Sequence, residues 1–326
     1  MKAVVWTKYG PPEVLVLKYV PKPTPKNNEV LIKVHATTAT AGDCEVRRFE
    51  IPRKYWLFAR IMWGLRKPKR VNILGMELAG VVESVGRDIT RFKKGDQVFG
   101  STDINLGAYV EYKCLPEDAC LTKKPTNMTY EEAAAVPRGG LESLHLLRQG
   151  NVSSGQDILI IGAGGSIGTY GVQLAKHFGA EVTAVDSTKK LDMLRSIGAD
   201  KVIDYTKEDF TKREERYDVI FDVVSRGPFT GHITVLKEKG ILLTANAMKS
   251  RIIREPGKSK ADSRRIIGWS PSYNTEGLNY LKELIEVGKI KAVIDRRFPL
   301  EKIVEAHRYV ETGRKKGNVI ITVVKD

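Results

Sequence analysis

The sequence predicts an α/β protein in which a doubly wound parallel sheet accompanies a second domain rich in strands. Its 326 residues, 42% hydrophobic and 29% charged, have an ordinary globular composition and suit roughly two domains of about 150 residues. In residues 126–273, short apolar runs alternate with helical stretches, which is the pattern of parallel βαβ units. Residues 1–125 instead show short β-branched runs bounded by glycine, proline or asparagine, which predict strands and turns.

Strands in the N-terminal part are predicted at Val4–Trp6, Val30–Val34 and Leu78–Val82. One segment interrupts this pattern, because residues 53–70, RKYWLFARIMWGLRKPKR, mix basic residues with aromatic ones. Such a segment can form a helix on a membrane surface or a nucleic-acid-binding patch. We favour a plainer interpretation, a helical insertion whose aromatic face covers a pocket while its lysines and arginines stay in water.

The alternation of strands and helices fills the rest of the chain. Helices are predicted at residues 130–135, from the glycine cluster to 178, at 190–197, 276–287 and 300–312. Strands are predicted at residues 158–161, 182–185, 201–203, 219–222, 241–243, 292–294 and 319–324. Because the rhythm changes near residues 126 and 273, we divide the chain into segments 1–125, 126–273 and 274–326.

The segment from Ile158 to Asp186 reads ILIIGAGGSIGTYGVQLAKHFGAEVTAVD. A buried strand runs into a turn with Gly162, Gly165 and Gly168, and then into a helix. Glycines let the backbone approach a pyrophosphate, whose charge then meets the amides of the helix N-terminus. The spacing is GxxGxxG, not GxGxxG, but an acidic residue at the end of the next strand, about 20 residues on, is typical of a dinucleotide site. We therefore predict such a site here.

The residues at the end of the strand 182–185 and just after it favour different dinucleotides. The Asp186 carboxylate can accept hydrogen bonds from ribose hydroxyls and would repel a 2′-phosphate, which favours NAD(H). Ser187 and Thr188 supply hydroxyls, and Lys189 and Lys190 supply positive charges, all of which suit a 2′-phosphate. A solvated helix start is the alternative explanation of the two lysines.

Further motifs follow one another along the whole chain. They are KAVV (2–5), LGMELAGVVESVG (74–86), GDQVFG (95–100), GAYVEY (107–112), EEAAAVP (131–137), the glycine turn, GADKVIDY (198–205) and VIDRRFPLEKIVEAHRYVETGRKKGNVIITV (293–323). With them the chain resembles the medium-chain dehydrogenase/reductase superfamily, in its zinc-free quinone-oxidoreductase-like branch. The resemblance implies a GroES-like β-barrel catalytic domain made from segments 1–125 and 274–326, with a Rossmann NAD(P)-binding domain, 126–273, inserted between them.

The zinc-dependent alcohol dehydrogenases of that superfamily differ from this chain at their metal ligands. They read GHE where this chain has Gly75-Met76-Glu77, and a thioether is a poor ligand for zinc. If Asp43 matches the aspartate that follows their first cysteine ligand, the ligand position holds Thr40. Residues 136–139, near their third ligand, include no cysteine or acidic residue, and their four-cysteine structural lobe is missing. We therefore expect no metal site and no zinc.

The resemblance also implies which residues bind the cofactor. Ser166 and Ile167 would lie at the pyrophosphate. Ser187, Lys189 and Tyr205 would lie at the adenosine phosphate, which favours NADP(H) over NAD(H). The remaining residues, along the nicotinamide ribose and over the cofactor, are Val224, Ser225, Ala245, Asn246 and Asn318.

Without a metal, a reduced nicotinamide must meet an electron-poor acceptor. Quinones and α,β-unsaturated carbonyls suit this, because the charge that arrives with hydride spreads onto oxygen. We therefore predict an NAD(P)H-dependent oxidoreductase that acts on a small electrophilic substrate of this kind. Zinc-free relatives often carry an asparagine and a tyrosine in the loop where this chain has Thr40 and Glu45. Thr40 is the candidate catalytic donor, whereas Asp43 is expected to tie the loop to backbone amides.

The charge balance leaves other partners open. Lys and Arg number 54 against 39 Asp and Glu, a net charge of +15, which suits nucleic acid, an anionic membrane surface or an anionic small ligand. A dinucleotide is such a ligand, but RNA binding of the zeta-crystallin type and a cofactor-binding scaffold without turnover are alternatives. Three cysteines without CxxC spacing, no signal peptide and no apolar stretch of about 20 residues predict a cytoplasmic protein without a membrane span. The resemblance implies a homodimer.

Overall fold

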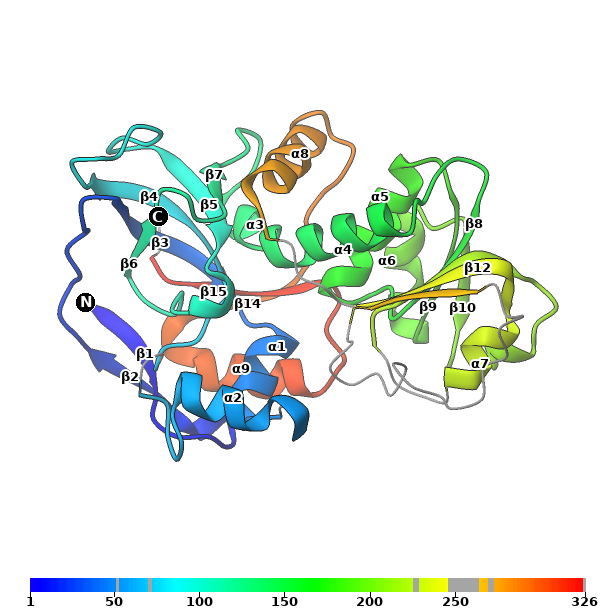
Figure 1. The fold of residues 1–326 in the computed structure, drawn as a ribbon, viewed down its shortest axis with the longest axis horizontal. Coiled ribbons are helices and arrows are strands. Elements are labelled where there is room, and N and C mark those ends of the chain that lie inside the picture. The colour runs from blue at the N-terminus through cyan, green and yellow to red at the C-terminus, as the bar shows by residue number, and fades with distance from the viewer. Residues whose placement is uncertain (51–52, 70–71, 225–228, 246–263, 269–272, 325–326) are drawn as a thin grey trace. The chain divides into compact units, whose positions relative to one another are not determined.

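The fold is shown in Figure 1 by a computed structural model, which describes residues 1–50, 53–69, 72–224, 229–245, 264–268 and 273–324. The chain forms two compact units, one from Met1–Arg138 with Tyr273–Asp326 and one from Gly139–Ser272. The first break lies beyond residue 125 because α3 (Tyr130–Ala134), where the helical rhythm begins, packs against strands of the first unit. Within the described residues, no helix has the length and apolar character needed to cross a bilayer.

The first unit is built around a mixed sheet with the strand order β14-β15-β3-β4-β5-β7, in which β6 also pairs with β3. The strands are β3 (Glu29–Thr38), β4 (Glu77–Val85), β5 (Gln97–Ser101), β6 (Tyr112–Pro116), β7 (Leu121–Lys123), β14 (Ile294–Pro299) and β15 (Asn318–Thr322), with β1 (Lys2–Trp6) and β2 (Leu15–Tyr19) as a separate antiparallel pair. β15 runs parallel to β14 and antiparallel to β3, where Ile320 lies opposite Thr38. The C-terminal segment therefore completes the sheet of the N-terminal segment.

Three helices of the first unit lie side by side in Figure 1: α1 (Ala41–Arg48), α2 (Arg53–Trp63) and α9 (Ile303–Glu311). They share an apolar core that includes Phe49, Trp63 and Ile303, and each fully buried side chain of this size contributes about 1.5–3 kcal/mol to folding. α8 (Thr275–Glu286) packs against β7. Short 3-10 helices lie at Pro12–Val14, Asp103–Asn105, Thr188–Lys190, Phe210–Lys212 and Leu300–Lys302.

The second unit contains a parallel sheet with the strand order β10-β9-β8-β11-β12-β13. Its strands are β8 (Asp157–Ile161), β9 (Glu181–Asp186), β10 (Lys201–Asp204), β11 (Tyr217–Asp222), β12 (Leu236–Thr244) and β13 (Arg265–Gly268). Its helices are α5 (Ser166–His177), α6 (Leu191–Ser196), α7 (Phe229–Thr234) and, from Gly139 onward, α4 (Pro137–Gln149). The order reverses between β8 and β11, and open α/β sheets bind ligands beyond the carboxyl ends of the strands at such a point. The predicted fold class, a Rossmann sheet with a GroES-like domain, is confirmed.

One predicted strand is misplaced. The apolar triplet at 292–294 predicted a strand, but β14 begins only at Ile294 and continues through Asp295, Arg296 and Arg297 to Pro299. These charged residues are tolerated because β14 is an edge strand, paired with β15 alone in the strand order, so that both arginines reach water.

Candidate active site

The glycine turn joins β8 to α5, whose first residues are Ser166 and Ile167. Gly162 has a φ of +77°, which L residues rarely adopt. A Cβ on Gly168 would stand 2.5 Å from the Gly162 carbonyl oxygen, so only glycine lets α5 lie this close to the turn. The N-cap residue, Gly165, brings no side chain to cap the helix. The N–H groups of the first turn therefore point out of the helix N-terminus, as pyrophosphate binding needs.

Asp186, at the end of β9, turns its carboxylate toward the protein. Oδ2 accepts a hydrogen bond from the Gly164 amide and Oδ1 one from the Ser187 amide, each at 2.8 Å. The Nζ of Lys190 lies 3.1 Å from Oδ1, and the two side chains are only 9% and 6% exposed. Asp186 thus ties the glycine turn to β9, and Lys190 offsets the negative charge that would repel a 2′-phosphate.

Three predicted residues gather at the carboxyl ends of β9 and β10. Asp186 lies opposite Asp204 in the register of these strands, and the amide of Tyr205 donates to the Asp186 carbonyl at 3.3 Å. Ser187 is partly exposed, Lys189 is exposed and Tyr205 is 58% exposed. We call Ser187, Lys189 and Tyr205 the rim residues, because all three are at least partly accessible at the strand ends near the buried Asp186–Lys190 pair.

Two more predicted residues lie at the same edge of the sheet, after β11 and β12. A Cβ on Gly162 would stand 2.1 Å from Cγ2 of Val224, so Val224 packs directly against the glycine turn. Ala245 is buried, and its amide donates to the Asp222 carbonyl at 3.1 Å. Both positions fit a ligand that extends from the turn along the strand ends.

The other three predicted cofactor residues are not placed at this edge. Ser225 and Asn246 lie outside the described residues. Asn318 belongs to the first unit, where it is buried at the start of β15 and its side-chain Nδ2 donates to the Val293 carbonyl at 3.1 Å. Their roles stay predictions.

Thr40, the candidate catalytic donor, is buried just before α1. Its hydroxyl donates to Oδ2 of Asp43 at 2.6 Å and accepts from the Asp43 amide at 3.0 Å. Because the Thr40 amide also donates to the Asp43 carboxylate, the two residues form a capping box that fixes the start of the helix. Asp43 also accepts from the amides of Thr40 and Gly75, each at 3.0 Å, so it ties the loop to backbone amides as predicted. Burial raises the pKa of Asp43. The Thr40 hydroxyl proton is already engaged, and its catalytic role stays a prediction.

Glu77 of β4 is buried near this loop. It accepts hydrogen bonds from the Thr38 hydroxyl and, at 2.8 Å, from the Arg138 amide. Burial raises the pKa of Glu77 to about 7, although these hydrogen bonds and the Arg138 charge oppose the shift. The guanidinium Nη2 of Arg138 lies 3.2 Å from the point where a Cβ on Gly42 would stand. The Arg138 charge also opposes the rise in the pKa of Asp43. The start of α1 thus holds a cation that interacts with two buried carboxyl groups.

The known proteins that resemble this chain include dehydrogenases and reductases. Residues 26–126 match the family model for the alcohol dehydrogenase GroES-like domain, and residues 197–321 match the model for zinc-binding dehydrogenases. A 2-methylene-furan-3-one reductase of Solanum lycopersicum is 35% identical over 340 residues, covering 98% of this chain and 79% of that protein. The quinone oxidoreductase of Homo sapiens is 29% identical over 96% of this chain and 94% of its own. The quinone oxidoreductase structure from Coxiella burnetii superposes with a TM-score of 0.88 at 31% identity, covering 99% of both chains.

The chain belongs to the medium-chain dehydrogenase/reductase family, in its quinone oxidoreductase branch. The predicted family is therefore confirmed, and with it an enzyme, an NAD(P)H-dependent oxidoreductase. Membership favours this activity over the nucleic-acid-binding and scaffold alternatives.

In this medium-chain dehydrogenase/reductase, Met76 and Arg138, from two of the stretches compared with zinc ligands, both lie against Gly42. Met76 Cε lies 3.5 Å from the same Cβ point that Arg138 approaches, and Thr40 caps the helix that contains Gly42. Among the residues that the structure describes, no group of three or more His, Cys, Asp or Glu side chains could hold a metal ion. Arg138 was assigned no role from the sequence, although it is the lone charged residue in the otherwise apolar stretch AAAVPRGG.

A buried polar cluster lies between α1 and α9 of the reductase, around His307. Its Nδ1 lies 3.0 Å from Nη1 of Arg47, and its Nε2 lies 3.1 Å from the Tyr109 hydroxyl. Arg47 also donates to the Gly10 carbonyl at 3.0 Å and pairs with Glu311. Burial, with the Arg47 charge, lowers the pKa of His307 to about 3, so the ring is neutral and Nδ1 accepts from Arg47. The cluster joins the N- and C-terminal segments of the catalytic unit.

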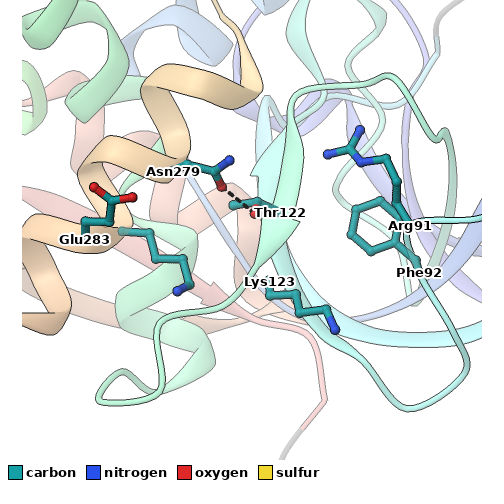
Figure 2. Close-up of a pocket in the computed structure, with 7 residues that line it drawn as sticks. Arg91, Phe92, Thr122, Lys123, Asn279 and Glu283 are labelled. Atoms are coloured by element: carbon teal, nitrogen blue, oxygen red, sulfur yellow. Dashed lines mark hydrogen bonds between the residues drawn. The ribbon is translucent and has the colours of Figure 1, made fainter.

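Figure 2 shows a surface pocket of about 490 Å³ in the first unit, between α8 and β7. Two of the residues that line it, Thr122 and Asn279, share a hydrogen bond of 2.6 Å. The full lining is Arg91, Phe92, Thr122, Lys123, Asn279, Lys282 and Glu283. Six of these seven residues are polar or charged, and none of the predicted site residues is among them.

Proposed function

We propose that this enzyme reduces a quinone or an α,β-unsaturated carbonyl with NADPH and without a metal ion. The observation that carries the proposal is the Arg138 guanidinium at the start of α1, where thioether and hydroxyl side chains accompany it instead of metal ligands. The names of relatives support the same substrate class, since one is a 2-methylene-furan-3-one reductase and another an NADPH-dependent alkenal/one oxidoreductase.

The chain's own residues bind and orient the dinucleotide. The amides at the start of α5, at Ser166 and Ile167, take the pyrophosphate. Ser187, Lys189 and Tyr205 take the 2′-phosphate, and Lys190 keeps Asp186 from repelling it. The bound cofactor supplies a hydride to the electrophilic carbon of the substrate.

Arg138 supplies positive charge for the reacting carbonyl. When hydride adds to a conjugated carbonyl, the electron pair of the double bond moves toward oxygen, which becomes negative before a proton from solvent neutralises the product. A fixed guanidinium stabilises this oxygen more in the transition state than in the ground state. Arg138 is held from two sides, because its amide donates to Glu77 and its guanidinium lies against the start of α1. Its side chain is partly exposed, so a substrate can reach it.

We also propose a cofactor preference, the remaining cofactor-binding residues, a location and an assembly for the enzyme. NADP(H) is preferred over NAD(H), because the rim residues are accessible and the charge of Asp186 is offset. Val224, Ser225, Ala245, Asn246 and Asn318 complete the cofactor site. The enzyme acts as a cytoplasmic homodimer.

An oxidation assay with a panel of acceptors tests the proposal. In the reductive direction, NADPH is mixed with quinones, enones or alkenals. In the oxidative direction, NADP is mixed with simple alcohols. Each mixture is measured with and without a chelator. We expect oxidation of NADPH by quinones or enones that the chelator leaves unchanged. Turnover of simple alcohols that a chelator abolishes would refute the metal-free assignment, and binding of NADPH without oxidation by any acceptor would refute the activity.

A further inference from the structure

Helix α2 is held to the first unit by one face. Ala59 and Trp63, four residues apart, are buried in the core shared with α1 and α9. The Trp63 ring packs edge-on against Phe49, with ring centroids 6.3 Å apart. The Arg60 guanidinium lies 3.9 Å from the Phe49 ring centroid and 4.6 Å from that of Tyr9. These contacts fix the rotation of the helix about its axis, so its outward face is defined.

The described part of the outward face is apolar. Leu57 and Ile61 are 63% and 64% exposed, and Leu65, two residues beyond the end of the helix, is 63% exposed. Trp56 is 42% exposed but belongs to the inner face, where its ring packs edge-on against Phe49 with ring centroids 6.0 Å apart. Leu57 and Ile61 each lie two residues, about 200° of helix rotation, from a buried residue of the inner face. We call Leu57, Ile61 and Leu65 the α2 face. Leu57 and Ile61 are one helical turn apart, and three aliphatic side chains this exposed within nine residues indicate a surface that contacts a partner.

The charge around the α2 face has one sign. Residues 53–70 contain seven lysines and arginines and no aspartate or glutamate. Of these basic residues, Arg66, Lys67 and Lys69 are exposed and follow the helix directly. Exposed aliphatic side chains followed by lysines and arginines are the composition of helices that lie in the interface of an anionic membrane.

Other occupants fit this surface less well. Basic and aromatic side chains increase the affinity of a protein for nucleic acid, but three exposed aliphatic side chains add little to it. A second copy of the chain would bring two basic segments together around the same face, and like charges repel. An anionic bilayer, by contrast, takes the aliphatic side chains into its acyl boundary and the ammonium and guanidinium groups at its headgroups.

We infer that the α2 face docks this reductase onto anionic lipid bilayers as a peripheral, reversible contact. The helix has 11 residues and lies on the membrane surface; it does not span it. The inference is independent of which acceptor is reduced. It also gives a role to part of the +15 net charge, since a dinucleotide needs only a few basic groups.

Vesicle cosedimentation tests the inference, with phosphatidylcholine alone and with phosphatidylcholine mixed with phosphatidylglycerol. We expect the full chain to bind the anionic vesicles at least roughly tenfold more tightly than the neutral ones, and more weakly as NaCl rises from about 0.1 M to about 0.5 M. The double variant Leu57→Glu/Ile61→Glu should lower binding roughly tenfold or more, because it removes apolar contact and adds repulsion. Val287→Glu is the matched control, since Val287 is 68% exposed at the end of α8, outside the α2 face.

Thermal unfolding and NADPH binding of each variant show that it folds as the wild type does. Equal binding of wild type and double variant to anionic vesicles would overturn the inference, and so would binding of neither vesicle type. If the double variant instead dissociates a dimer, or loses RNA binding while vesicle binding is absent, the surface serves another partner and the inference fails. The NADPH readout separates these outcomes from a failure of the proposed reductase activity.

Discussion

The buried pair of Lys190 and Asp186 makes a specific prediction about cofactor choice. Replacing Lys190 by methionine keeps the length of the side chain and removes its charge, which leaves the Asp186 carboxylate buried beside the adenosine end of the site. Breaking a buried pair from one side costs about 3–5 kcal/mol. We expect the lower part of this range, because the amides of Gly164 and Ser187 still donate to the carboxylate, each at 2.8 Å.

The same change should weaken NADPH binding more than NADH binding. In the wild type, Lys190 Nζ lies 3.1 Å from Asp186 Oδ1 and neutralises the charge of the carboxylate. In the variant, this negative charge is no longer neutralised and repels the 2′-phosphate. Over roughly 7 Å, at an effective dielectric constant of about 40, this costs about 1 kcal/mol, or roughly five- to tenfold in Kd. Isothermal titration with NADPH and NADH in parallel measures the ratio of the two dissociation constants, and denaturant unfolding measures the stability.

Two further variants isolate the cause. Lys190→Met/Asp186→Asn removes both charges and should restore most of the NADPH to NADH ratio, whereas Lys189→Met removes an exposed charge and should weaken NADPH binding without loss of stability. If Lys190→Met lowers the stability but leaves the ratio of dissociation constants unchanged, the pair has no part in cofactor choice and the reasoning is wrong.

Three other predictions concern the catalytic unit. Burial raises the pKa of Glu77 to about 7, above its unfolded value, so its contribution is fully present at low pH and is lost as the pH rises through about 7. Relative to Glu77→Gln, the wild type should therefore lose about 2–3 kcal/mol between about pH 5 and pH 8 in urea unfolding, and parallel curves would contradict this. Arg138→Leu should lower kcat/KM roughly 100- to 1000-fold with NADPH affinity unchanged, and Arg138→Lys should recover part of it; a fully active Arg138→Leu enzyme would exclude the proposed charge stabilisation. Arg47→Met should destabilise the fold by about 1–3 kcal/mol, because His307 Nδ1 and the Gly10 carbonyl lose a buried donor while Glu311, 22% exposed, keeps Arg48; a loss below about 0.5 kcal/mol in urea unfolding would show that the cluster adds little.

The parts of the fold that depend on local sequence could be predicted. The apolar strand Ile158–Ile161, the glycines after it and Asp186 are close in the chain, and their spacing indicated both the parallel sheet and the dinucleotide turn. The direction in which Asp186 points could not be predicted in this way, since the i,i+4 spacing of Lys190 is compatible with either a solvated lysine or a buried ion pair.

The polar contacts of the catalytic unit depend on residues far apart in the chain. Arg47 and His307 are separated by 260 positions, and Glu77 and Arg138 by 61. No periodicity in the sequence links such residues, because the sheet closure that brings them together is a long-range event. The insertion forms a helix, α2, as expected, with Trp63 buried in the core and Leu57 and Ile61 facing outward. That its aromatic face covers a pocket stays a prediction.

The most direct test of the central claim is the fate of the transferred hydrogen. The enzyme is given NADPH deuterated at the hydride-donating position of the nicotinamide, together with an enone, in ordinary water, and the product is analysed by mass spectrometry. Direct hydride transfer predicts one deuterium on the β-carbon of the saturated ketone and a slower reaction than with unlabelled NADPH. A saturated product without deuterium, or an enone that remains unreduced while NADPH stays bound, would contradict the assignment.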